Sequence, residues 1–279
     1  MNNHLSGNPG VWRFVIFFLI LTAAENSGAQ SNNPVSVAPE KQTLSSGEPV
    51  LMQVHVKNTA SVPLEIDLGL NGKDNILIVV TQPDGKRIEK PQPVPRNGVA
   101  FFGWQHLEGG QEYSEVLVLN EWFEFKQVGR YQIQVRLREP ATVGAEKIPS
   151  GPFVLNFDVT PPNIEELLGA CKDLVARVSR HQSAQDNIAA ESALRYVDDP
   201  GMLPFWKERV TDKSLTIREI AFFNLTRTGS MDVVEILSRA IHSQDKDTKS
   251  LARSALEQIA RATSDIDVKA RAKQVLSRR

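Results

Sequence analysis

Histidine is the side chain that most often serves as a metal ligand or a general base near neutral pH. The five histidines stand at positions 4, 55, 106, 181 and 242. Only His242 has a possible second ligand three or four residues away, Asp245, whereas a zinc site needs three or four such ligands. The pair indicates a turn at the end of a helix, and the sequence predicts no metal site.

The other residues able to do chemistry also have structural explanations. Asp198 and Asp199 precede Pro200-Gly201, so a turn accounts for them. Cys171 falls on the apolar stripe of an expected helix, where it should be a buried small hydrophobe. No nucleophile elbow, phosphate loop or dinucleotide fingerprint occurs. The sequence predicts no catalytic residue and no cofactor, and an enzyme is the least favoured alternative.

Aromatic residues gather in two stretches of the first half of the chain. One is Trp122-Phe123-Glu124-Phe125, and the other comprises Phe101-Phe102 and Trp104. Neighbouring side chains on a strand point to opposite faces, so at most one of the two sets can lie in the core. Packing in the core or over a sheet edge is favoured, and a platform for a carbohydrate or a peptide is the alternative. Trp122 is the candidate partner-binding residue here.

The N-terminus predicts export. Arg13 is followed by an uncharged apolar run at 14–24 and by small residues that end at Ala29. Eleven residues make a helix of about 16 Å, too short for a hydrocarbon layer of about 30 Å. We therefore expect residues 1–29 to be a signal peptide cleaved before Gln30, with 30–33 as a polar linker. An uncleaved anchor is the alternative, and a periplasmic or extracellular location follows from cleavage.

Composition limits the partners. The chain has 279 residues, with 32 basic and 33 acidic side chains. This balance gives no long-range field that would favour nucleic acid or an anionic membrane. With one cysteine, no internal disulfide is possible. We expect an unknown protein partner, no nucleic acid, and no membrane span after signal cleavage.

Residues 34–160 show the period-2 alternation of half-buried strands. Strands are expected at 50–57, 64–70, 75–81, 99–104, 115–119, 131–137 and 153–159. A turn at 82–85 follows the third, because Pro83 presets one dihedral and Gly85 supplies a positive φ. The step Gly129-Arg130-Tyr131 resembles the late strand of bacterial immunoglobulin-like domains. That resemblance, with the strand spacing, implies an immunoglobulin-like β-sandwich.

Pro161-Pro162 ends the strand region, and helical periodicity covers 163–279. Asn163 and Glu166 form a capping box at its start, and the pairs Thr216/Glu219 and Asp232/Glu235 predict two more. At a shift of 31 residues, apolar positions match in three copies. The matched positions include Leu174, Phe205 and Ile236, then Ala190, Ala221 and Ala252, then Leu194, Leu225 and Leu256.

The copy at Asp212, Ile217-Arg218, Ala221 and Leu225 resembles bacterial HEAT-like repeats. The resemblance implies a short α-solenoid of about three helical hairpins at 163–279. The complete expectation is therefore a multidomain chain, all-β and then all-α. Arg218, and Lys249 one repeat later, are candidate partner contacts, although the resemblance favours structural bonds between repeats for both.

These observations together favour an exported, non-catalytic binding or scaffold protein that acts through protein–protein interaction. A proteinase-inhibitor-like protein is the alternative from a different class. Its motivation is the stretch 91–98, which three prolines stiffen and which carries Arg96. A plain connector between strands is the favoured explanation of that stretch.

Overall fold

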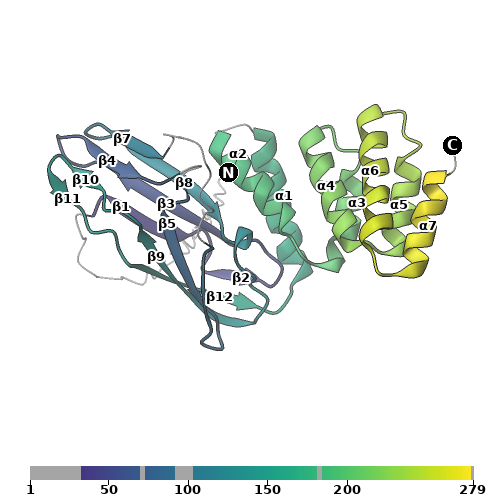
Figure 1. Cartoon of the computed structure of the whole chain (residues 1–279), viewed down its shortest axis with the longest axis horizontal. Helices are drawn as coiled ribbons and strands as arrows, with labels where there is room; N and C mark the ends of the chain where they lie inside the picture. The colour runs from purple at the N-terminus through teal and green to yellow at the C-terminus, as the bar shows by residue number, and fades with distance from the viewer. Residues whose placement is uncertain (1–32, 70–72, 92–102, 181–183, 278–279) are drawn as a thin grey trace, which may run out of the picture. The chain divides into compact units, whose positions relative to one another are not determined.

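The computed structural model describes residues 33–69, 73–91, 103–180 and 184–277. Residues 33–279 belong to one compact unit, in which strands come first and helices follow (Figure 1). The predicted signal peptide at 1–29 and most of the linker at 30–33 lie outside the described residues. The boundaries of all the predicted domains stay predictions.

The strand region contains one short strand for nearly every apolar run of the sequence. Its elements are β1 (Val35–Pro39), β2 (Thr43–Ser45), β3 (Leu51–Lys57), β4 (Leu64–Asp67), β5 (Ile76–Thr81), β6 (Arg87–Glu89), β7 (Trp104–Leu107), β8 (Glu112–Val118), β9 (Gly129–Leu137), β10 (Thr142–Val143), β11 (Glu146–Lys147) and β12 (Phe153–Thr160). A 3₁₀ turn, η2 (Leu119–Glu121), follows β8. The predicted strands correspond to β3, β4, β5, β8, β9 and β12, and the one at 99–104 lies mostly outside the described residues.

Period-2 alternation determines which strand faces form the core. In β5 the alternate residues Ile76, Ile78 and Val80 are buried, while the residues between them are half-buried. The predicted turn at 82–85 is confirmed, because the Gly85 amide donates to the Gln82 carbonyl at 2.9 Å and Gly85 has a φ of +84°. One hydrophobic cluster is shared by strands of all the sheets.

The prediction of an immunoglobulin-like sandwich is wrong. The described strands form three sheets, in the orders β1-β3-β8, β11-β10-β4-β7 and β2-β12-β9-β5-β6. The five-stranded sheet is mixed, because β2 pairs in parallel with β12 while β12 pairs antiparallel with β9. Alternation reports which face of a strand is buried, but it carries no information on which distant strand becomes its neighbour.

The helices match the predicted apolar stripes closely. They are α1 (Ile164–Arg180), α2 (Ala184–Arg195), α3 (Leu203–Arg209), α4 (Leu215–Thr228), α5 (Met231–Ala240), α6 (Lys246–Ala262) and α7 (Ile266–Ser277), with a 3₁₀ turn η3 (Pro200–Met202) before α3. The predicted N-cap at Asn163 is confirmed, since its Oδ1 accepts from the amides of Glu165 and Glu166. The reciprocal bond of the predicted capping box is not formed, because Glu166 accepts from the side-chain Nδ2 of Asn163 and the Asn163 amide donates to Ser45 Oγ.

Two other predicted caps are wrong by two residues. Ser214 caps α4 through the Ile217 amide, and Ser230 caps α5 through the Val233 amide. In both helices a serine hydroxyl just before the first turn caps the helix, whereas the sequence pattern had placed the cap two residues later, inside the helix.

The predicted solenoid is also wrong, because the hairpins are not copies of one unit. Helices α1 and α2 have 17 and 12 residues, α3 and α4 have 7 and 14, and α5 and α6 have 10 and 17. A repeat array needs equivalent hairpins that contact only their neighbours. The 31-residue match therefore reflects helical periodicity shared by unequal hairpins.

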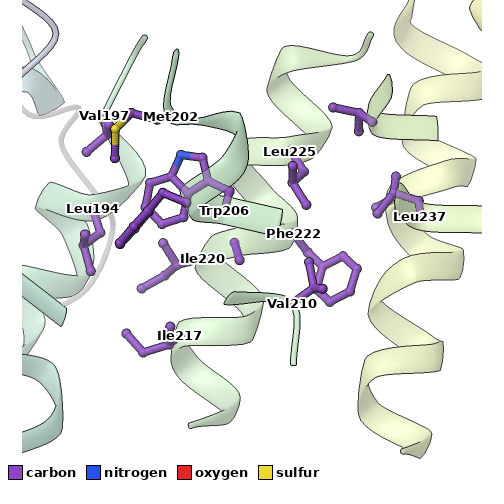
Figure 2. Packing of buried hydrophobic residues seen from close by; sticks show 14 of the residues in the cluster. Leu194, Val197, Met202, Trp206, Val210, Ile217, Ile220, Phe222, Leu225 and Leu237 are labelled. Atoms are coloured by element: carbon purple, nitrogen blue, oxygen red, sulfur yellow. The ribbon is translucent and has the colours of Figure 1, made fainter. Parts of the chain in front are cut away.

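A single hydrophobic cluster runs through all the helices and includes two strand residues, Leu51 and Val118. Figure 2 shows part of this cluster, with the indole of Trp206 lying among aliphatic side chains between the helices. Leu51 and Val118 are opposite each other in the β3–β8 register. The outer side of the sheet β1-β3-β8 is thus covered in part by helices, and α2 packs on β8.

Candidate functional site

A cleft of roughly 500 Å³ opens where the strand region meets the helices, and we call it the junction cleft. Its lining comes from five separate stretches of the chain: Ser46, Gly47, Glu48, Asn120, Phe123, Glu124, Phe125, Lys126, Pro162, Tyr196, Asp198, Asp199 and Arg227. Clefts of this size between structural units are common ligand sites in proteins. Its chemistry is mixed, with aromatic rings, carboxylates and two cations.

Aromatic packing fixes the strand side of the junction cleft. Phe123 and Phe125 are buried, and the Phe125 ring meets the rings of Tyr131 and Phe157 edge-on at centroid distances of 5.3 and 5.5 Å. On the helical side, burial raises the pKa of the Tyr196 hydroxyl, with Glu121 adding to the rise. Aromatic residues therefore belong to the lining on both sides of the cleft.

Asp198 is the central charge of the junction cleft. Its Oδ1 lies 3.6 Å from Nη2 of Arg227, and its Oδ2 lies 3.9 Å from Nζ of Lys126. Arg227 also donates to the carbonyls of Arg195 and Val197 at the end of α2. This network joins α4, the turn after α2 and the segment that precedes β9.

Two other carboxylates of the cleft hold the backbone in place. Asp199 caps η3 by accepting from the Gly201 amide at 2.7 Å. Glu48 accepts from the Ser45 amide at 3.2 Å and pairs with Lys41. At Gly47, with a φ of +91°, an added Cβ would lie 3.3 Å from the Asp198 carbonyl oxygen. Glycine thus allows the turn after β2 to approach the turn after α2 closely.

Trp122, a predicted partner-binding residue, is half-buried and is not part of the lining of the junction cleft. The ammonium groups of Lys90 and Lys73 lie 4.7 and 5.3 Å from its ring centroid. Lys90 is itself buried and donates to the carbonyls of Ile76 and Lys73. The ring therefore stabilises internal cations, and its predicted role toward a partner stays a prediction.

Glu121 connects this lysine cluster with the helices. Its carboxylate pairs with Lys73 and accepts from the Ser192 hydroxyl of α2 at 3.0 Å. A continuous polar path therefore runs from the Trp122 ring through Lys73 and Glu121 to α2.

The two other predicted partner-binding residues, Arg218 and Lys249, lie in different surroundings. The Arg218 side chain is only 12% exposed. It donates to the Asp212 carbonyl at 3.1 Å and lies 3.8 and 3.6 Å from the carboxylates of Asp245 and Asp247. Lys249 is exposed on α6. Neither residue lines the junction cleft.

The residues first considered for chemistry lie apart from one another. His55 is on β3, His106 on β7 and His242 follows α5, while Cys171 is fully buried in α1, as predicted. Burial raises the pKa of the Cys171 thiol to about 12. The described residues contain no group of histidine, cysteine and carboxylate side chains suited to a metal ion. Arg96 and most of the stretch 91–98 lie outside the described residues.

Within the described ranges, no helix combines the length and apolarity that a bilayer span requires.

Comparisons with known proteins give no family. No protein-family model and no curated protein matches the chain. Among solved structures, a β-glucosidase from Listeria innocua is 14% identical with a TM-score of 0.25, over 47% of this chain and 16% of that one. The alkylpurine DNA glycosylase AlkC of Pseudomonas fluorescens is 12% identical with a TM-score of 0.24, over 48% and 32%.

The sporulation control protein Spo0M of Bacillus subtilis is 13% identical with a TM-score of 0.23, over 52% of this chain and 54% of that one. The chain thus spans less than two thirds of each of these three proteins. TM-scores this low carry no conclusion on fold or activity.

Proposed function

We propose that this chain is an exported, non-catalytic binding protein that engages a protein partner through the junction cleft. The observation that carries the proposal is the cleft itself, roughly 500 Å³ with aromatic residues in its lining and exposed charges at its rim. Protein partners commonly bind where aromatic anchors are surrounded by a polar rim.

The charges of the cleft support binding rather than proton transfer. Asp198 lies between two cations, and Asp199 and Glu48 accept backbone amides. A general acid or base must be free to exchange a proton with a substrate. Carboxylates already engaged in these contacts hold the cleft in shape, and a preformed cleft lowers the entropic cost of binding.

The rim offers a means of steering. Glu124 and Lys126 are both largely exposed, and Nζ of Lys126 lies 3.5 Å from Oε2 of Glu124. Opposite charges at a rim fix the orientation of a partner more than they add affinity. Export rests on the apolar run at 14–24, and N-terminal sequencing of the secreted chain should give Gln30 as the first residue.

The test is capture of partners from the exported fraction with the full chain, followed by measurement of Kd for the purified partner. Ser46→Trp fills the junction cleft, and Ser250→Trp adds the same bulk to the exposed face of α6 as the matched control. We expect Ser46→Trp to weaken binding by about tenfold or more, and Ser250→Trp to bind as the wild type does.

Equal affinity of both variants would contradict the proposal. Lys126→Glu provides a second test if Ser46→Trp lowers the melting temperature, because Lys126 is exposed and its reversal leaves the packing intact.

A further inference from the structure

Trp104 stands out among the tryptophans that the structure describes, because its side chain is 58% exposed while Trp206 is only 3% exposed. It begins β7, which is the edge strand of the sheet β11-β10-β4-β7. An exposed indole offers a large flat apolar surface with one polar N–H.

The strand register assigns polar neighbours to the same side of the sheet. Trp104 is opposite Asp67, and His106 is opposite Glu65 in the β4–β7 pair. Leu64, Ile66 and Leu107 occupy the alternate positions and are buried. Because successive side chains point to opposite faces, Trp104 and its polar neighbours share the outward face.

The outward face continues across the sheet onto β10 and β11. Thr142 of β10 is opposite Glu65, and Lys147 of β11 is opposite Thr142. The outward face, which we call the Trp104 face, therefore consists of Glu65, Asp67, Trp104, His106, Thr142 and Lys147.

Local geometry fixes the carboxylate next to the indole. Asp67 Oδ1 accepts from the Gly69 amide at 2.9 Å, and the Leu68 amide donates to the Gly103 carbonyl at 2.9 Å. A Cβ at position 103 would lie 2.3 Å from Asp67 Oδ1. Glycine at 103 thus leaves room for the Asp67 carboxylate at the position opposite Trp104.

His106 holds two carboxylates on the same face. Its ring nitrogens lie 3.1 Å from Glu108 and 3.5 Å from Glu65, and these carboxylates raise the pKa of the imidazole. The Trp104 face thus has an apolar ring next to carboxylate acceptors that His106 positions.

We propose that the Trp104 face binds an uncharged β-1,4-linked oligosaccharide whose ring substituents are equatorial. Such a pyranose ring presents axial C–H groups that stack on a flat indole. Its hydroxyl groups donate to the carboxylates of Glu65, Asp67 and Glu108. The three carboxylates Glu65, Asp67 and Glu108 disfavour a polyanion. An extended peptide would need a long free strand edge, whereas β7 has four residues.

The test is titration of the full chain with cellohexaose and with chitohexaose by calorimetry. We expect at least one of the two sugars to bind the wild type. Trp104→Ala should lower the affinity by about tenfold or more, the effect of losing an aromatic stacking surface. Asp67→Asn should weaken it less, because the amide oxygen still accepts from Gly69. Phe223→Ala, another exposed aromatic at 42%, is the control and should bind normally.

Absence of binding to both sugars would overturn the proposal, as would a Trp104→Ala protein that binds as tightly as the wild type. Loss of binding in Phe223→Ala as well as Trp104→Ala would also overturn it, because the effect would then not belong to this face. Binding of an extended peptide, with no response to either sugar, would assign the face to a peptide instead. Melting curves establish that each variant is folded.

Discussion

Nη2 of Arg227 lies 3.6 Å from Oδ1 of Asp198, and this contact closes the helical side of the junction cleft. Arg227 is in the last turn of α4, and Asp198 follows α2. The same guanidinium donates to two carbonyls at the end of α2, of Arg195 and Val197. One side chain therefore caps a neighbouring helix and positions the central carboxylate of the cleft.

Arg227→Ala should lower the free energy of unfolding by about 1 to 2 kcal/mol, because hydrogen bonds to two carbonyls are lost. Urea denaturation measures the change. Arg261→Ala is the control, since Arg261 is exposed and makes one i,i+4 pair with Glu257; such a pair contributes little. A loss no larger than that of the control would show that Arg227 does not hold the two helices together.

Leu51→Ala should destabilise the chain by about 2 to 4 kcal/mol, as expected for a buried leucine that leaves a cavity. Leu51 belongs to the helical hydrophobic cluster although it is in β3. Hydrogen exchange should therefore become faster in α1 and α2. The exposed Val154 of β12 provides the control variant Val154→Ala. Unchanged protection in both helices would contradict the packing of helices on this sheet.

The buried ammonium of Lys90 should make its contribution to the free energy of unfolding depend on pH. Burial is the main cause that lowers its pKa from the ordinary value of 10.5 to about 8; Lys73 and Arg138 add to the lowering, while Asp74 and Glu121 oppose it. Between these two pH values the unfolded chain binds more protons than the folded chain. The contribution of Lys90 to folding stability therefore rises with pH over this window and is least favourable below it.

The measurement compares the free energies of unfolding of the wild type and Lys90→Met at about pH 8 and about pH 10. The free energy of unfolding of the wild type, relative to that of Lys90→Met, should be greater at the higher pH. Tyr113, Tyr131 and Tyr196, whose pKa values burial raises, act in the opposite direction but cancel in the difference. Lys86→Met, at an exposed lysine, is the control variant. A difference that stays constant, or reverses, would contradict a buried ammonium beside Trp122.

Arg218→Ala and Lys249→Ala should separate structural from surface roles at matched positions of α4 and α6. Arg218→Ala loses the bond to the Asp212 carbonyl and its contacts with two carboxylates. We expect a loss of about 1 to 2 kcal/mol in thermal or urea unfolding. Lys249→Ala should leave stability unchanged. Equal effects of the two substitutions would show that the buried contacts of Arg218 contribute nothing.

The sequence predicted the helices well, because the apolar stripe of an amphipathic helix marks the face that becomes buried. Leu51 illustrates what local pattern could not predict. It alternates with Met52, so strand alternation places the two side chains on opposite faces, yet Leu51 is also buried, under the helices. Apolar residues on both faces of β3 and β8, such as Leu51 and Val118, were the available signal that a second layer covers the sheet.

The junction cleft itself could not be predicted. Gly47, Lys126, Asp198 and Arg227 come from distant parts of the chain, and only tertiary packing brings them together. Asp198 was explained by a turn, which is true of its neighbour Asp199 but omits its pairing with Arg227. Likewise, the parallel pairing of β2 with β12 leaves no trace in the alternation of either strand.

Site-specific photo-crosslinking tests the central claim most directly. A benzoylphenylalanine at position 124 stands at the rim of the junction cleft, and one at position 261 provides a control, because the native side chains are 79% and 82% exposed. After irradiation in the exported fraction, position 124 should give one defined protein adduct, which Ser46→Trp abolishes, and position 261 should give none. The same adducts from both positions, or an adduct at 124 that persists in Ser46→Trp, would contradict binding through the junction cleft.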